Sequence, residues 1–133
     1  MNMRKYIFLF SLIIFNSCIP PKSKFYVQNF SNEIITIITV PSIENKLNLK
    51  EENKPLFDSI MSIKKNNSDE IGIYELKQNE KMLLYQSYGR KSFKPPYAKV
   101  EIVKSNDTLK INRENFKQLS YKKSNRNYIA KIN

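Results

Sequence analysis

The stretch "FYVQNFSNEIITIITVP", residues 25–41, decides the fold class of this chain. As a strand, residues 25–30 would place Phe25, Val27 and Asn29 on one face and the residues between them on the other. Residues 33–40 are rich in β-branched side chains and predict a strand that is buried on both faces. The Ser-Asn pair at 31–32 indicates a turn, and Pro41 ends the second strand. Together these features predict a β-hairpin at the start of a domain.

The rest of the chain repeats this strand pattern at short intervals. Further strands are predicted over residues 71–76, 81–89, 97–104, 108–112 and 125–133. Before the last of them, residues 113–119 predict one helical turn with Asn112 as its N-cap.

Residues 42–70 allow two interpretations. Leu47 and Leu49 alternate as in a short strand, whereas Pro55 suits the first turn of a helix. Helical spacing then continues through Leu56, Phe57, Ile60, Met61 and Lys64. A single short helix and a further strand both stay open for this part of the chain.

These elements predict a mainly β fold. Six to eight short strands in about 110 residues favour an antiparallel β-sandwich, immunoglobulin-like or transthyretin-like, with at most one or two short helices. Strands do not alternate with long helices, which argues against a parallel α/β sheet. The 133 residues suffice for one domain, which we place at residues 25–133.

Residues 1–17 have the features of a secretory signal. Arg4 and Lys5 precede an apolar run over 6–15 that only Ser11 interrupts. About ten apolar residues make a helix of about 15 Å, too short for a bilayer core that needs about 20 residues.

The only cysteine of the chain follows directly, in the sequence Phe15-Asn16-Ser17-Cys18. Residues 1–18 resemble a bacterial lipoprotein signal peptide, in which the cysteine becomes the first residue of the mature protein and carries acyl chains such as palmitate. Ser17 matches the small residue before the cleavage point, and Cys18 matches the lipidated cysteine. Phe15 and Asn16 depart from the usual leucine and small residue, as in the looser motifs of Bacteroidota. The abundance of Asn, Lys and Ile agrees with such a source.

The resemblance implies stable attachment to a membrane, because two or three acyl chains hold more firmly than one. A plain signal peptide with an incidental cysteine and an uncleaved anchor are the alternatives. Residues 18–24 then form a tether of about 20 Å, extended by Pro20 and Pro21. Basic rather than acidic residues in it favour the periplasmic face of the outer membrane. The segments "FYVQNFSNE", "NDTLKI" and "YIAKI" are also similar to small Bacteroidota lipoproteins, a resemblance that implies no activity.

The net charge of +11 is unevenly distributed along the chain. Residues 18–89 contain nine basic and nine acidic side chains, whereas residues 90–133 contain twelve basic and three acidic ones. Such an excess indicates an anionic partner: lipid headgroups, lipopolysaccharide, a cell-wall polymer or an acidic protein. Nucleic acid is not expected, because an exported protein rarely meets it. Solvated lysines that reflect an AT-rich genome are the alternative. The predicted binding face comprises Arg90, Lys91, Lys94, Lys122, Lys123 and Arg126.

Four aromatic residues, Tyr85, Tyr88, Phe93 and Tyr97, flank the basic loop at 90–94. An exposed platform for a sugar or a lipid headgroup is one interpretation. Strand aromatics that fill the core are the other, and we favour it.

The absence of histidine and the single cysteine exclude Cys/His zinc sites, Ser-His-Asp triads and Cys-His pairs. No motif indicates a cofactor. Adjacent carboxylates at 51–52 and 69–70 point apart in an extended chain, and a distant pair such as Glu75 with Glu101 stays open. We therefore expect a non-enzymatic, lipid-anchored envelope protein. An inhibitor or immunity-type protein that caps an acidic partner is the second hypothesis, and an envelope hydrolase is the third.

Overall fold

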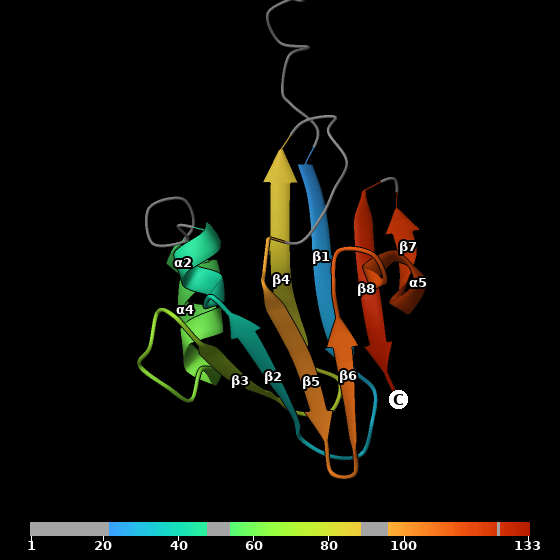
Figure 1. The fold of residues 1–133 in the computed structure, drawn as a ribbon, viewed down its shortest axis with the longest axis horizontal. Coiled ribbons are helices and arrows are strands. Elements are labelled where there is room, and N and C mark those ends of the chain that lie inside the picture. The colour runs from blue at the N-terminus through green and yellow to red at the C-terminus, as the bar shows by residue number, and fades with distance from the viewer. Residues whose placement is uncertain (1–21, 48–53, 89–95, 125) are drawn as a thin grey trace, which may run out of the picture.

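Two four-stranded sheets enclose one core in the computed structural model, which describes residues 22–47, 54–88, 96–124 and 126–133 (Figure 1). Sheet A has the strand order β4-β1-β8-β7, and sheet B has the order β3-β2-β5-β6. Sheet A consists of β1 (Lys22–Asn29), β4 (Lys81–Tyr88), β7 (Ser120–Ser124) and β8 (Asn127–Ile132). Sheet B consists of β2 (Ile35–Val40), β3 (Gly72–Leu76), β5 (Lys99–Lys104) and β6 (Asp107–Ile111).

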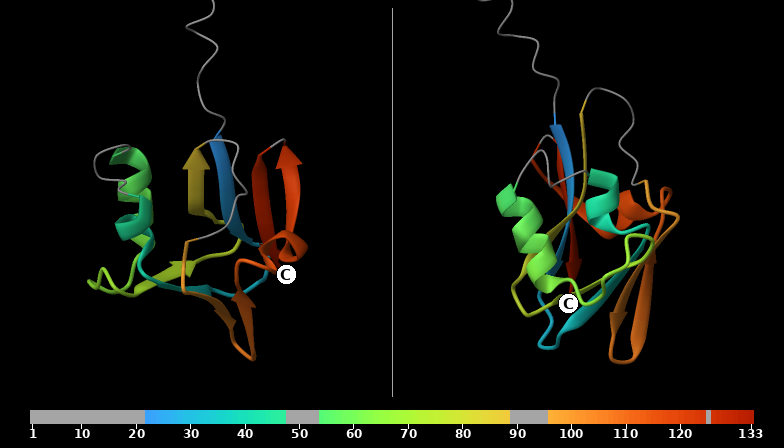
Figure 2. Two further views of the ribbon diagram at one scale, coloured as in Figure 1. Left: turned by 45° about the horizontal axis from the view of Figure 1, so that its top comes forward. Right: turned by 90° about the vertical axis from the view of Figure 1, so that its left-hand side faces the viewer.

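Helices close the two open sides of the sandwich. The described residues contain α2 (Ile43–Leu47), α4 (Lys54–Ile63) and α5 (Phe116–Leu119). α2 and α4 lie beside β3 and β4, and α5 lies at the opposite side near β7 and β8 (Figures 1 and 2). The predicted mainly β sandwich is confirmed, although these ranges hold three short helices where one or two were expected.

β1 is a central strand of sheet A. It pairs antiparallel with β4 and parallel with β8, so the first and last described strands lie side by side. It begins at Lys22, which places residues 22–24 in the sheet rather than in a tether. The domain therefore starts three residues before the predicted boundary at 25.

Residues 25–41 form two strands, but the predicted hairpin between them is wrong. β1 pairs with β4 and β8, whereas β2 pairs with β3 and β5. The chain therefore crosses from one sheet to the other over residues 30–34. β2 is also not buried on both faces. Ile35, Ile37 and Thr39 are fully buried, and the residues between them are half-buried because they lie on the outer face of sheet B.

The side chain of Asn29 holds this crossing in place. It is fully buried, and its Nδ2 donates to the carbonyl oxygens of Glu33 (2.8 Å) and Leu76 (2.9 Å). Its Oδ1 accepts hydrogen bonds from the backbone nitrogen (2.9 Å) and the hydroxyl (2.6 Å) of Ser31. The side-chain amide of Asn29 thus joins the end of β1, the crossing segment and the end of β3, and both its nitrogen and its oxygen have hydrogen-bond partners.

Where the structure describes residues 42–70, they form the helices α2 and α4, followed by a loop over residues 65–70. α4 confirms the helix interpretation, with Pro55 in its first turn, where the lack of a backbone N–H costs nothing, and Ile60 buried. The predicted short strand at 47–49 is wrong for Leu47, which ends α2, and Leu49 lies outside the described residues. Alternation over three residues is too short a signal to outweigh the packing of this segment against β4.

α5 brings Phe116 into the core. Its ring meets those of Phe25 and Tyr128 edge to face, with centroids 5.6 Å and 5.9 Å apart. Asn112 caps the turn before α5 rather than the helix itself. Its Oδ1 accepts hydrogen bonds from the backbone nitrogens of Glu114 and Asn115, both at 2.8 Å.

Two of the four aromatic residues beside the basic loop belong to the core. Tyr97 is buried and its hydroxyl donates to the carbonyl of Leu84, and Tyr85 packs partly buried against the core. Tyr88 is instead 54% exposed, and Phe93 lies outside the described residues. Both sheets and every described core residue lie between residues 22 and 132.

We expect Asn29→Ala to lower the free energy of unfolding by at least about 3 kcal/mol, because each buried polar group left unpaired costs about 1–3 kcal/mol. Urea unfolding measures the loss. Asn32→Ala is the control, since Asn32 is exposed and binds only Gln78 among the described residues, at 3.1 Å. Equal losses in the two variants would contradict the role of Asn29.

Candidate functional site

The predicted binding face falls largely outside the described residues. This applies to Arg90, Lys91 and Lys94 and to the side chains of Lys122 and Lys123, whose backbone belongs to β7. Arg126 is described, in the turn between β7 and β8, and its carbonyl accepts a hydrogen bond from the backbone nitrogen of Lys24 at 2.9 Å. The prediction therefore stays untested as a set.

The strands β1, β4, β7 and β8 each have a terminus at the end of sheet A where Arg126 lies. β4 ends, β1 begins and β7 turns into β8 at the same end of the sheet (Figure 1). Lys22 lies opposite Tyr88 at this end, and Lys24 lies opposite Asn127. The structure thus brings Arg126 next to two lysines that the sequence prediction omitted.

A larger basic surface covers the outer face of sheet A. Alternate residues of β1 from Lys22 to Gln28 point outward, because Phe25, Val27 and Asn29 are buried on the inner side. Residues opposite each other in a sheet share a face. The resulting rows are Tyr88–Lys22, Gln86–Lys24–Asn127, Leu83–Tyr26–Ile129 and Lys81–Gln28–Lys131. Leu83 and Ile129 are only 3% and 2% exposed, so the lysines lie at the two ends of this face, on either side of a covered apolar row. We call the surface formed by Lys22, Lys24, Lys81 and Lys131 with Tyr26 and Tyr88 the cationic face.

Three of these lysines form cation–π contacts with aromatic rings. The Nζ of Lys22 lies 5.3 Å from the ring centroid of Tyr88, and the Nζ of Lys81 lies 4.8 Å from that of Tyr26. The Nζ of Lys131 lies 5.2 Å from the ring of Phe30. Such cation–π contacts direct the ammonium groups without neutralising them.

No strand of sheet A contains an acidic residue. Sheet B differs, because its outer carboxylates pair with nearby lysines. Glu75 lies 3.1 Å from Lys65, and Glu101 lies 3.0 Å from Lys99 and 3.8 Å from Lys110. By contrast, no described carboxylate forms an ion pair with Lys22, Lys24 or Lys81. A genome rich in lysine codons would explain the number of lysines but would not by itself explain why acidic residues occur in sheet B and not in the strands of sheet A.

The sequence contains a signal that predicts this surface. Residues 18–32, 81–100 and 115–133 lack Asp and Glu altogether, and they supply the strands of sheet A. The count of charges over residues 90–133 does not predict this surface, because Lys22, Lys24 and Lys81 lie earlier in the chain. Only the pairing of β1 with β4 and β8 joins them.

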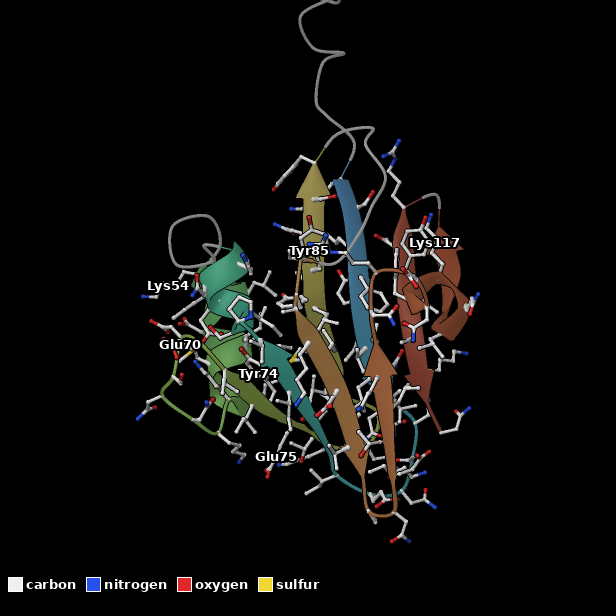
Figure 3. All side chains as sticks on the ribbon, viewed as in Figure 1. Lys54, Glu70, Tyr74, Glu75, Tyr85 and Lys117 are labelled. Carbon is white, nitrogen blue, oxygen red and sulfur yellow. The ribbon has the colours of Figure 1, made fainter. Side chains whose placement is uncertain are left out.

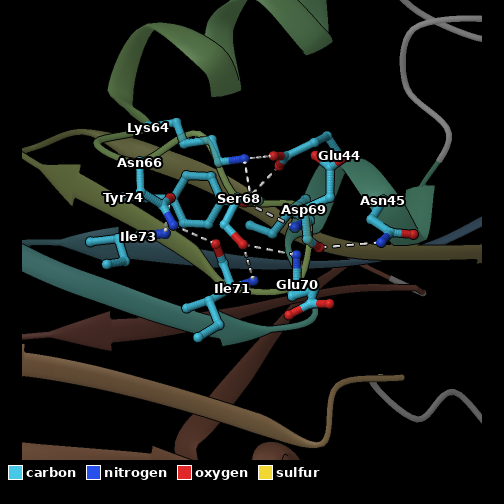
Figure 4. A network of polar contacts seen from close by, with 11 residues as sticks. Glu44, Asn45, Lys64, Asn66, Ser68, Asp69, Glu70, Ile71, Ile73 and Tyr74 are labelled. Carbon is cyan, nitrogen blue, oxygen red and sulfur yellow. Dashed lines mark hydrogen bonds and ion pairs between the residues drawn. The ribbon is translucent and has the colours of Figure 1, made fainter.

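A second cluster of ionisable groups lies buried between α2, β3 and the loop after α4 (Figure 4). Lys64 forms an ion pair with Glu44, and their side chains are 2% and 7% exposed. The hydroxyl of Tyr74 donates to Glu44 Oε2 (2.7 Å) and accepts from the backbone nitrogen of Ile43 (2.9 Å). Lys64 Nζ also donates to the carbonyl of Ser68 at 2.8 Å. Each charged group in the cluster is therefore paired.

The cluster keeps Glu44 ionised. Burial opposes its charge, but hydrogen bonds from Lys64 and Tyr74 outweigh that effect and hold the pKa of Glu44 below its ordinary value. Burial and the hydrogen bond to Glu44 raise the pKa of Tyr74 far above its ordinary value, so the phenol stays protonated. Gly72 makes room for this ring, because a Cβ there would overlap it. The charged groups are shielded from solvent and paired, which indicates a structural role.

Among the described carboxylates considered in the sequence, Glu75 and Glu101 do not converge, because they lie on strands on opposite sides of β2. Residues 51–52 lie outside the described part, and Asp69 and Glu70 are exposed in a turn. Figure 3 shows Glu70 and Glu75 on the outside of the molecule, far from Lys117 of α5. No group of three His, Cys, Asp or Glu in the described ranges is arranged to hold a metal ion.

A hollow of about 510 Å³ lies between the β5–β6 hairpin and the end of β8. Ile102, Leu109 and Ile132 contribute its apolar lining, and charges of both signs surround it. Lys104 at this hollow lies 3.8 Å from Glu33 and donates to the backbone of Asn133 at 2.6 Å. Because this lysine already has two partners, the cationic face remains the stronger candidate site.

Comparison with protein-family models, curated proteins and solved structures finds no match. The function is therefore argued from the geometry of this chain. Within the described ranges, no helix has the length and apolar character needed to cross a bilayer.

We expect Lys64→Met to lower the free energy of unfolding by about 3–5 kcal/mol, since it leaves a buried carboxylate without its cation. The matched control is Lys65→Met, because the Lys65–Glu75 pair is about half exposed and such pairs contribute about 0–1 kcal/mol. Urea unfolding at neutral pH compares the two variants. Similar losses would contradict the buried pairing.

The same cluster predicts a dependence of stability on pH. The pKa of Glu44 is lower in the folded than in the unfolded chain, so its contribution is complete above its ordinary pKa of 4.5 and disappears as the pH falls below that value. The double variant Glu44→Gln/Lys64→Met lacks this titration. Urea midpoints measured between about pH 6 and pH 3 should therefore fall less steeply in the double variant than in the wild type. Parallel curves would contradict the assignment.

Proposed function

We propose that this is a non-enzymatic, lipid-anchored protein of the cell envelope that binds an anionic partner through its cationic face. Cys18 would carry the acyl chains, in the outer membrane with the domain toward the periplasm. The observation that carries the proposal is the position of this cysteine, directly after the signal-like segment and four residues before β1.

The short connection links the anchor to the candidate site. Four residues span at most about 14 Å when fully extended. They lead into β1, which is central in sheet A and supplies Lys22 and Lys24 to the cationic face. An anchor at Cys18 would thus hold the face close to the membrane surface.

The burial and pairing of the described ionisable groups support a binding role rather than a catalytic one. Glu44, Lys64 and Tyr74 are enclosed and paired, and the carboxylates of Glu75 and Glu101 bind lysines on an outer sheet face. The groups of the cationic face are instead exposed or half-exposed lysines and tyrosines, which recognise anions by charge and contact.

An inhibitor or immunity-type protein that caps an acidic partner is the second candidate. The same observation favours it, because a face without acidic residues also complements an acidic protein surface. Such a protein would bind its partner equally well without acyl chains.

Metabolic labelling with an alkyne analogue of palmitate tests the anchor. We expect the wild type to be labelled and to sediment with membranes, and Cys18→Ala to lose both properties. The matched control is Cys18→Ala/Pro20→Cys, which restores a thiol two residues away and should remain unlabelled. Equal labelling of the wild type and Cys18→Ala would end the proposal of lipidation.

A further inference from the structure

We propose that the cationic face lies flat on a bilayer leaflet that carries anionic phospholipids, with the headgroup phosphates as its ligands. The inference rests on the proposed function, because the anchor at Cys18 brings the face to the membrane. It adds a defined partner and a defined orientation of the domain.

The spread of the lysines matches a charged plane. From Lys22 to Gln28, the six residue steps of β1 cover about 20 Å, and the two strand spacings from β4 to β8 cover about 10 Å. Lys22 and Lys24 lie toward one end of this area, and Lys81 and Lys131 lie on either side of Gln28 at the other. These cations are distributed over three strands and do not follow a single line.

The tyrosines on this face suit the headgroup region. Tyr26 lies half-buried in the middle of the face, and Tyr88 is 54% exposed at the end where β1 begins. A tyrosine ring with a polar tip is favoured where apolar chains meet water. Lysine side chains place their ammonium groups beyond such rings and reach the phosphates.

Charge also distinguishes the two outer faces of the sandwich. No described carboxylate pairs with Lys22, Lys24 or Lys81, which an anionic surface would attract, whereas Lys99 and Lys110 of sheet B already share Glu101. One acyl anchor and one basic patch are the two signals that together give stable and oriented membrane binding. Sheet B then faces away from the bilayer.

Vesicle sedimentation tests the face without the anchor. The protein is the chain from residue 18 onward with Cys18→Ser, which keeps both sheets and the complete described core. We expect binding to vesicles that contain about 30% phosphatidylglycerol in phosphatidylcholine, no binding to pure phosphatidylcholine, and weaker binding as salt screens the charges.

Two matched double variants locate the contact. Lys24→Gln/Lys81→Gln should weaken binding to the anionic vesicles about 25-fold, because each lysine near an anionic surface contributes a factor of about five. Lys99→Gln/Lys110→Gln removes the same charge from sheet B and should change binding less than about twofold, because those lysines remain far from the membrane. Urea unfolding checks that both variants are folded.

Equal weakening by the two double variants, or binding that does not depend on phosphatidylglycerol, would overturn the inference. Heparin serves as a soluble acidic polymer. Tight binding to heparin without binding to anionic vesicles would also overturn it and assign the face to a polymer. The protein in the vesicle assay carries Cys18→Ser, so a failure to bind vesicles counts against the cationic face alone. A failure of palmitate labelling counts against the anchor alone.

Discussion

Parallel hydrogen bonding between β1 and β8 joins the beginning and the end of the described chain, and the rest of the structure depends on it. With β4 on its other side, β1 satisfies its backbone groups on both edges. Parallel neighbours cannot be joined by a tight turn and need a long connection. Here that connection contains all of sheet B and the three described helices, so the sandwich is built within a single crossover from β1 to β8.

Buried polar groups fix how sheet B joins this frame. Apolar burial favours compactness but has no direction, whereas a buried amide or ion pair must find partners of defined geometry. Asn29 ties the crossing from sheet A to the end of β3, and the Glu44–Lys64 pair ties α2 to the loop after α4. Both are enclosed, and both are satisfied. They specify how the elements are arranged. Because they are enclosed and already paired, they are not available to bind a partner.

The same strand pairing creates the charge pattern of the outer surface. Lysines from three distant segments meet on the outer face of sheet A, although none lies directly opposite another. On sheet B, Lys99 and Lys110 pair with Glu101. This difference in charge between the two sheets is the observation from which we propose a binding role for the cationic face, with a membrane as its partner.

The sequence by itself determined that β3, β4 and β5 are strands and that the segment with Pro55 is a helix, because alternation, β-branching and helical spacing act between close neighbours. The resemblance of residues 1–18 to a lipoprotein signal stays a prediction. Only the tertiary structure decided which strands pair. The hairpin predicted over residues 25–41 is replaced by a crossing between sheets, because the amide of Asn29 bonds to Leu76, 47 residues away. The cationic face was missed for the same reason: Lys81 becomes a neighbour of β1 only through long-range backbone hydrogen bonds, which no local pattern encodes.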